Sequence, residues 1–171
     1  MDATEAPATS LPASGPESRI RADHHDALRL WLRLLACTLL IERRIRGQLR
    51  ERFAMTLPRF DLMAQLERYP QGLKMSELSR RLMVTGGNVT GLTDQLVAEG
   101  LVERQRVPDD RRAYAVRLTA EGKRVFDGMA AEHEQWVIAM MAGLPADRQA
   151  SLYGLLGELK ASLRPDAEDA T

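Results

Sequence analysis

The sequence predicts a mainly α-helical fold of about six helices with one small β-hairpin, arranged as a winged helix-turn-helix beside a helical dimerisation region. Apolar residues recur every three or four positions along most of the chain, which is typical of amphipathic helices. Tyr114, Val116 and Leu118 instead alternate as a half-buried strand does, and the preceding arm, 101–107, alternates less cleanly. The 171 residues are 44% hydrophobic, enough for one core. The formal net charge is +0, so any anion-binding surface must come from a local basic patch.

The two ends of the chain predict no structure. Residues 1–23 are rich in Pro, Ala and Ser, lack the basic start and apolar centre of a secretory signal, and are expected to be disordered, as is the acidic tail 166–171. The longest apolar stretch, Leu34–Ile41, is too short to span a bilayer, so no membrane partner is expected. A single cysteine, Cys37, excludes an internal disulfide and favours a cytoplasmic location.

The first predicted helix runs from about His24 to Phe53, and apolar residues nearly surround its first half. Such a helix needs cover on more than one face, and in a chain this short the expected cover is a second subunit. Thr56-Leu57-Pro58 then restarts the chain as a helix over Arg59–Tyr69. This second helix is expected to bury Leu62, Met63 and Leu66, with either Phe60 or Tyr69, and Leu73 beyond it is assigned to a very short strand.

The helix-turn-helix is predicted in the next stretch. A short helix, Ser76–Leu82, ends at Met83-Val84, and Thr85 is the N-cap of a second helix over Gly86–Glu99 that Gly100 stops as the C′ residue. Val89, Leu92 and Leu96 are expected to face the core. In the alternative, Gly86-Gly87 is a loop and the helix starts at Asn88.

The wing is predicted from two arms, Leu101–Val107 and Ala113–Thr119, joined by the tip Pro108–Arg112. Thr119 should cap the following helix, and a last, Leu-rich helix starts at about Ala146. The predicted domains are the winged helix-turn-helix at 58–119 and the dimerisation region at 24–57 and 120–165.

Short polar residues near a helix N-terminus reach base edges and phosphates without holding the helix away from DNA, and Thr85, Asn88 and Thr90 meet this demand. Gly86 and Gly87 each cost a helix roughly 1 kcal/mol relative to Ala, which close backbone approach to a phosphate would offset. Arginines at a protruding tip suit a minor groove. The wing arginines are Arg111 and Arg112 at the tip, backed by Arg104, Arg106 and Arg117. The competing interpretation of the tip is a solvated turn.

From about His24 to Leu163 the chain resembles the MarR family of winged-helix transcriptional regulators. The resemblance rests on Met75–Ser79, Val89–Leu96, Glu99–Arg104, Asp110–Ala113 and Leu118–Gly122. It implies a homodimer whose recognition helices enter successive major grooves of a palindromic DNA operator while wing arginines reach the minor grooves. The DNA contacts carried over by position are Thr85, Gly87, Asn88, Thr90, Gln95 and the wing residue Arg112, with Asp110 as its ion-pair partner. Thr85-Gly86-Gly87 replaces the commoner Ser-Pro-Ser.

The resemblance also implies a repressor that a small molecule releases from its operator. The form of Val84–Thr90 is similar to that in regulators of aromatic-acid or hydroxycinnamate breakdown, so the implied effector is a phenolic acid or its CoA thioester. An aromatic slot and a basic site for its carboxylate or phosphates are candidates from the residue types. The aromatic-slot candidates are Trp31, Phe60, Met63 and Trp136, and the basic candidates are Arg29, Arg33, Arg43 or Arg44. Ordinary core and a solvated helix face are the competing interpretations.

Other classes remain as alternatives. A winged helix also serves as a protein-interaction module. A metal-sensing regulator is suggested by His24, His25 and Asp26, but adjacent helical side chains point about 100° apart and cannot share a ligand face alone. A redox switch would use Cys37, which is expected to be buried and unreactive. An enzyme is not expected, because catalytic and phosphate-loop motifs are missing, and neither a metal nor a cofactor is predicted.

Overall fold

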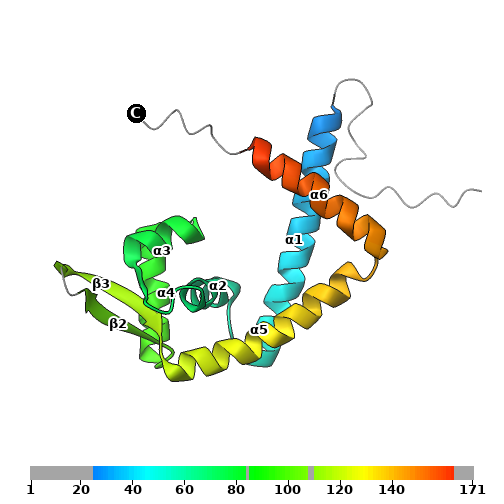
Figure 1. Ribbon diagram of the computed structural model, residues 1–171. Helices are drawn as coiled ribbons and strands as arrows, with labels where there is room; N and C mark the ends of the chain where they lie inside the picture. Colours follow the sequence, from blue (N-terminus) through cyan, green and yellow to red (C-terminus); the bar gives the residue numbers. More distant parts are fainter. Residues whose placement is uncertain (1–24, 84, 108–109, 164–171) are drawn as a thin grey trace, which may run out of the picture. The chain divides into compact units, whose positions relative to one another are not determined.

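The computed structural model describes residues 25–83, 85–107 and 110–163. Within them the order of elements is α1 (Asp26–Phe53), α2 (Leu57–Glu67), β1 (Leu73–Lys74), α3 (Met75–Leu82), α4 (Gly86–Ala98), β2 (Val102–Val107), β3 (Asp110–Leu118), α5 (Ala120–Met141) and α6 (Ala146–Ser162) (Figure 1). This confirms the predicted helical fold with a small β wing. The chain divides into two compact units, one up to Gly47 and the other from Gln48. Across the described residues, every helix is too short or too polar to cross a membrane.

The strands form one antiparallel sheet in the order β1-β3-β2. β1 pairs Leu73 with Val116, which confirms the short strand expected at Leu73. The β2–β3 hairpin extends away from α3 and α4 (Figure 1). β3 starts at Asp110 rather than at the predicted Ala113, because a register shift at Arg106/Val107 lets Asp110 pair with Val107. The tip is therefore shorter than predicted.

The core of the second unit lies where α2, α3 and α4 meet the sheet and α5. Its most deeply buried side chains include Leu62, Met63, Leu78, Val89, Leu96, Val116 and Met129. Phe60 is buried whereas Tyr69 is exposed, which resolves the choice between them. Leu92, predicted to face inward, is half-buried, and the residue that closes this face of α4 is Thr93, which is fully buried.

α2 begins at Leu57, two residues before the predicted Arg59, and ends at Glu67. Thr56 is its N-cap and Pro58 falls in its first turn, where the missing N–H of proline breaks no intrahelical hydrogen bond.

α4 begins at Gly86, so the alternative with Gly86-Gly87 as a loop is wrong. It ends at Ala98, one residue before the predicted end, with Gly100 at φ +71° as the C′ residue. The N–H groups of Gly100 and Leu101 donate to the carbonyls of Val97 and Leu96, both at 3.0 Å. This is a Schellman motif, and it confirms the stop signal expected at Gly100.

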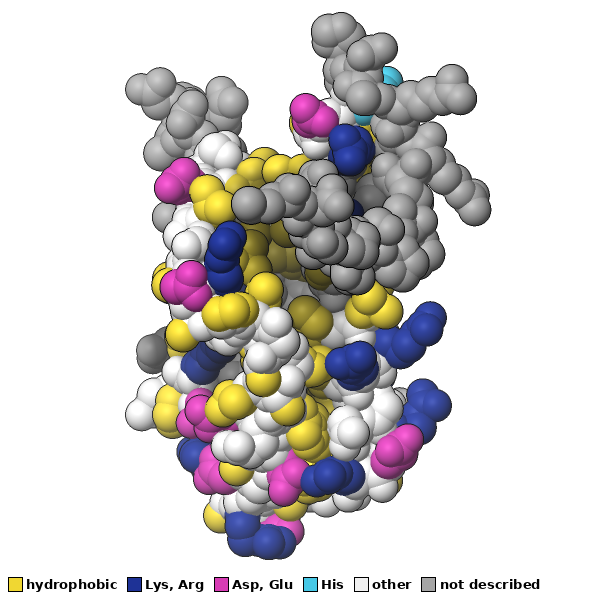
Figure 2. Space-filling model, turned by 90° about the vertical axis from the view of Figure 1, so that its right-hand side faces the viewer, with side chains coloured by type: hydrophobic (Ala, Val, Ile, Leu, Met, Phe, Trp, Pro, Cys, Tyr) yellow, Lys and Arg dark blue, Asp and Glu magenta, His cyan; other side chains and the backbone are white. Residues whose placement is uncertain are grey.

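The N-terminal part of α1 and the whole of α6 expose large apolar side chains. Leu28, Trp31, Leu35 and Leu39 follow each other at three- and four-residue spacing on α1, and all are exposed. α6 buries none of its residues, and its exposed stripe comprises Leu152, Leu155, Leu156 and Leu159. Figure 2 shows hydrophobic side chains (yellow) at the surface between charged ones. Cys37 is also exposed, so the prediction of a buried thiol was wrong: it assumed cover for this part of α1 that the described chain does not supply.

Candidate nucleic-acid interface

The helix-turn-helix is formed by α3 and α4. α3 ends at Met83, which adopts a left-handed conformation (φ 52°), and its N–H donates to the Arg80 carbonyl at 3.3 Å. Thr85 then takes the N-cap position of α4, as predicted, but its side chain makes no capping hydrogen bond. The exposed Thr85 hydroxyl is therefore not used to satisfy the helix N-terminus.

One face of α4 is closed and the opposite face is open. Val89, Thr93 and Leu96 are fully buried, and the Thr93 hydroxyl lies 3.8 Å from the sulfur of Met75. All five predicted recognition-helix contacts are exposed: Thr85, Gly87, Asn88, Thr90 and Gln95. Thr90 Oγ1 donates to the Gly86 carbonyl at 2.9 Å, so this hydroxyl has only acceptor capacity left for a partner.

The glycines of α4 have no packing role among the residues that the structure describes. A Cβ at Gly86, Gly87 or Gly91 would meet no atom within 4 Å, and none of the three has a positive φ. Each costs the helix roughly 1 kcal/mol relative to Ala. Neither internal space nor backbone conformation in the described part of the chain explains these glycines.

The arginines of α3 are held by one carboxylate. Glu77 accepts hydrogen bonds from Arg81, at 2.8 Å, and from Arg80. The hydrogen bond from Arg81, supported by Arg80, lowers the pKa of Glu77 below its ordinary value. The Arg81 guanidinium also lies 4.3 Å from the ring centre of Tyr69, which joins the end of α3 to the end of α2.

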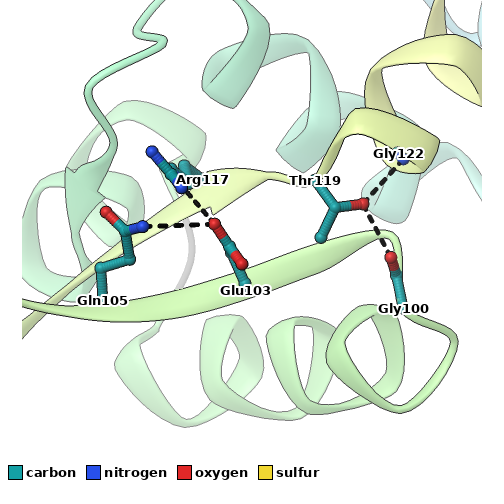
Figure 3. A network of polar contacts seen from close by, with 6 residues as sticks. All are labelled: Gly100, Glu103, Gln105, Arg117, Thr119 and Gly122. Atoms are coloured by element: carbon teal, nitrogen blue, oxygen red, sulfur yellow. Dashed lines mark hydrogen bonds and ion pairs between the residues drawn. The ribbon is translucent and has the colours of Figure 1, made fainter.

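Two of the three arginines expected to back the wing are engaged in ion pairs. Arg104 lies 2.5 Å from Asp94 of α4. Arg117 lies 2.5 Å from Glu103 on the neighbouring strand, with Gln105 beside them (Figure 3). Arg106 is exposed on β2. Asp110, Arg111 and Arg112 have their backbone in β3, but their side chains lie outside the described part of the structure.

A compact polar joint connects the end of α4 to the start of α5. Thr119 Oγ1 donates to the Gly100 carbonyl at 2.7 Å and accepts from the Gly122 N–H at 2.9 Å (Figure 3). The N–H of Thr119 donates to the Leu101 carbonyl at 3.1 Å. This confirms the predicted Thr119 N-cap and shows that the same residue also holds the C-terminal end of α4.

The effector candidates fall into two groups. Arg29, Trp31, Arg33 and Arg44 lie exposed on α1 in the first unit. In the second unit, Phe60 and Trp136 flank His133, with ring centres 5.1 Å and 6.3 Å from it. The Nε1 atom of Trp136 is buried and has no hydrogen-bond partner among the described residues. Met63 is fully buried core, with no surface to offer a ligand.

Sequence reasoning missed the ion pairs that link these elements. Arg59 in the first turn of α2 is buried and pairs with Glu99 at the C-cap of α4, a bond between residues 40 positions apart. Arginine is seldom buried, so no local signal marked it. The metal-sensing alternative has no site among the described residues, where no three His, Cys, Asp or Glu side chains cluster; His24 lies outside them.

The fold and this surface define a winged helix-turn-helix protein of the type found in transcriptional regulators. The sequence profile of the MarR family matches residues 55–113. The Bacillus subtilis HTH-type transcriptional regulator YhbI is 30% identical over 118 residues, which are 69% of this chain and 73% of that protein. The chain belongs to the MarR family.

Solved structures agree. A MarR family transcriptional regulator from Silicibacter pomeroyi superimposes with a TM-score of 0.71 and 29% identity, covering 84% of this chain and 100% of that one. Sco3205 of Streptomyces coelicolor, a MarR family regulator crystallised with DNA, shares the fold at a TM-score of 0.72 and 24% identity, over 88% and 95% of the two chains. Four Bacillus subtilis regulators, the repressor YetL among them, are covered over 54% to 63% of their own length.

Proposed function

We propose that the protein is a homodimeric, sequence-specific DNA-binding transcriptional regulator that acts in the cytoplasm as a repressor. The observation that carries the proposal is the division of α4 into a buried face and an open face of short polar side chains and glycines. A helix enters the major groove with just such a face, because bulky side chains would hold it away from the base edges.

The residue roles follow from this placement. Thr85, Asn88 and Gln95 offer hydrogen-bonding groups, and Gly87 with Thr90 allows the backbone to approach the phosphates. On the wing, Arg112 and Arg111 reach the minor groove, with Asp110 as the ion-pair partner of Arg112. Their position in the hairpin that extends beyond α4 supports these roles.

The DNA-binding part is tested by selecting 30-base-pair duplexes from a random pool with the purified protein. We expect a palindromic site to be enriched, since a two-fold dimer places its recognition helices about 34–36 Å apart. Arg112→Ala should weaken binding to all duplexes and reduce the salt slope by about 1. A pool that is not enriched after repeated rounds contradicts the proposal and favours a protein-interaction module.

The dimer is supported by the exposed leucine stripe of α6 and the apolar residues of α1, more uncovered apolar surface than single scattered residues present. Sedimentation equilibrium should give twice the mass of the 19.1 kDa chain. Leu155→Glu, within the stripe, should shift the protein toward monomer, whereas Ala161→Glu on the opposite side of α6 should leave it dimeric. If both Leu155→Glu and Ala161→Glu remain dimeric, α6 is not the interface.

The effector part proposes a phenolic acid or its CoA thioester. Aromatic rings at Phe60 and Trp136 and the unpartnered Trp136 Nε1 donor favour a flat ligand with an acceptor atom. Arginine is the residue type suited to the carboxylate of such a ligand. With the selected duplex, 4-hydroxycinnamate should weaken binding 5- to 150-fold, on the order of 1–3 kcal/mol of coupling. The matching alcohol, which lacks the carboxylate, should have no effect; equal effects of acid and alcohol would exclude an acid-specific site.

A further inference from the structure

The only charged side chain in α4 is Asp94, and its charge is negative. Asp94 lies four residues after Thr90 and seven after Gly87, so all three share one face of the helix. Its side chain is 57% exposed. A carboxylate on the face that approaches a polyanion is repelled by the phosphates, and a DNA-binding helix therefore has no electrostatic reason to carry one alone.

Asp94 is not alone, because Arg104 of β2 forms an ion pair with it. The Nη2 atom of Arg104 lies 2.5 Å from Asp94 Oδ1, and the pair bridges the recognition helix and the first strand of the wing. The C-terminal end of α4 is already attached to the start of β2 through the Schellman bonds of Gly100 and Leu101. The ion pair is a further attachment, one turn earlier in the helix. It acts beside the Thr119 bonds to the Gly100 and Leu101 carbonyls and the buried Val102 and Val116, and it is the charged contact that ties β2 to the side of α4 itself.

We propose that Asp94 and Arg104 act as a positioning clamp that holds the wing at a set angle to the recognition helix, so that both reach DNA in the same register. This inference rests on the DNA-binding function proposed above. Neither residue reads a base in this scheme. Arg104 acts by holding Asp94. The benefit of a fixed angle between wing and helix outweighs the repulsion between Asp94 and the phosphates.

If the pair acts as a clamp, its loss should weaken binding to the selected duplex, whereas charge alone predicts that it strengthens binding. Asp94→Asn removes a negative charge and frees Arg104, so affinity for a shuffled duplex should stay equal or rise. Affinity for the duplex selected by the wild-type protein should fall about tenfold, because the helix and the wing are no longer held in the positions that contact both grooves at once. The ratio of the two affinities, measured by fluorescence anisotropy at one salt concentration, is the readout.

Arg104→Gln should lower the same ratio, and the double variant Asp94→Asn/Arg104→Gln should be no worse than either single variant, since both changes break one interaction. The exchanged pair Asp94→Arg/Arg104→Asp should recover the ratio to within about threefold. Glu103→Gln is the matched control: it breaks the Arg117 pair, also 2.5 Å long, which joins β2 to β3 within the hairpin. This variant should keep the wild-type ratio.

Three results would overturn the clamp. If Asp94→Asn keeps the wild-type ratio, the pair positions nothing. If Arg104→Gln weakens both duplexes equally and reduces the salt slope, Arg104 is a phosphate contact. If Asp94→Asn changes the preferred base at a single position in a repeated selection, Asp94 is a base-reading residue. Failure of the wild-type protein to enrich any duplex would instead remove the DNA-binding proposal itself, so the two failures are distinguishable. Thermal unfolding of every variant checks that the fold is kept, as we expect when a partly exposed ion pair is removed.

Discussion

Gly122 of α5 lies directly against the backbone of Leu101, so closely that a Cβ at position 122 would stand 1.8 Å from the Leu101 carbonyl oxygen. The φ of Gly122 is not positive, so this glycine is required for space and not for conformation. The same carbonyl accepts the N–H of Thr119. The first turn of α5 is thus joined, backbone to backbone, to the segment that leaves the recognition helix.

We expect Gly122→Ala to destabilise the protein by at least about 2 kcal/mol, since the added methyl group forces a backbone shift that the usual helix preference for Ala does not offset. Urea denaturation followed by circular dichroism measures the change. Gly128→Ala in the same helix is the control: a Cβ there meets nothing within 4 Å, and the variant should be equally or slightly more stable. Equal stability of the two variants would mean that α5 does not sit against Leu101.

The hydroxyl of Thr119 should be worth more than an ordinary N-cap, because it satisfies Gly122 N–H and also donates to the Gly100 carbonyl. Thr119→Val keeps the shape and removes both hydrogen bonds, and we expect a loss of about 1–2 kcal/mol. Thr119→Ser restores the hydroxyl and should recover most of that loss. A serine variant as unstable as the valine variant would show that the methyl group, not the hydroxyl, holds the joint.

Local signals predicted the elements that depend on local physics. Gly100 was recognisable as a helix stop because few other residues adopt its positive φ, and Thr119 as a cap because its hydroxyl reaches an N–H three residues away. Three- and four-residue spacing correctly predicted that Val89 and Leu96 are buried, but it pointed to Leu92, which is half-buried, and missed Thr93, which is fully buried. Thr85 shows the limit: the N-cap position was correct, but its hydroxyl makes no capping bond.

Features that depend on tertiary geometry were not predictable. The pairs Asp94–Arg104 and Arg59–Glu99 join residues 10 and 40 positions apart, and nothing in their spacing shows that α4, β2 and α2 meet there. The exposure of Cys37 depends on what covers α1, which its own helical pattern does not contain. The early start of β3 depends on a register shift, whose position is set by pairing rather than by composition.

Thr85 allows stability and DNA binding to be separated. Because its hydroxyl forms no cap, Thr85→Ala should change the free energy of unfolding by less than about 0.5 kcal/mol, as a surface substitution does. If Thr85 contacts DNA as proposed, affinity for the selected duplex should fall about 5- to 100-fold, on the order of 1–3 kcal/mol. The two measurements are made on the same preparation by urea denaturation and fluorescence anisotropy. Loss of stability with full DNA affinity would reverse both assignments and make Thr85 a structural cap.

The stability of the second unit should depend on the protonation of His133. This side chain lies on α5, half-buried beside the Phe60 ring, and burial lowers its pKa below the ordinary 6.5. The unfolded chain therefore binds the proton more readily than the folded one. Stability should be full above pH 6.5 and should decrease as the pH falls from there through the lower folded-state pKa.

His133→Gln removes this titration, so the decrease in stability between pH 7.5 and about 5.5 should be larger in the wild-type protein than in the variant. Urea midpoints at the two pH values give the comparison. The carboxyls of Glu77 and Glu121 do not interfere, because their pKa values are lowered from 4.5 and their contribution is lost only in more acidic solution. An identical decrease in both proteins would show that His133 is protonated as easily in the folded state as in the unfolded chain, and that its contact with Phe60 does not exclude water.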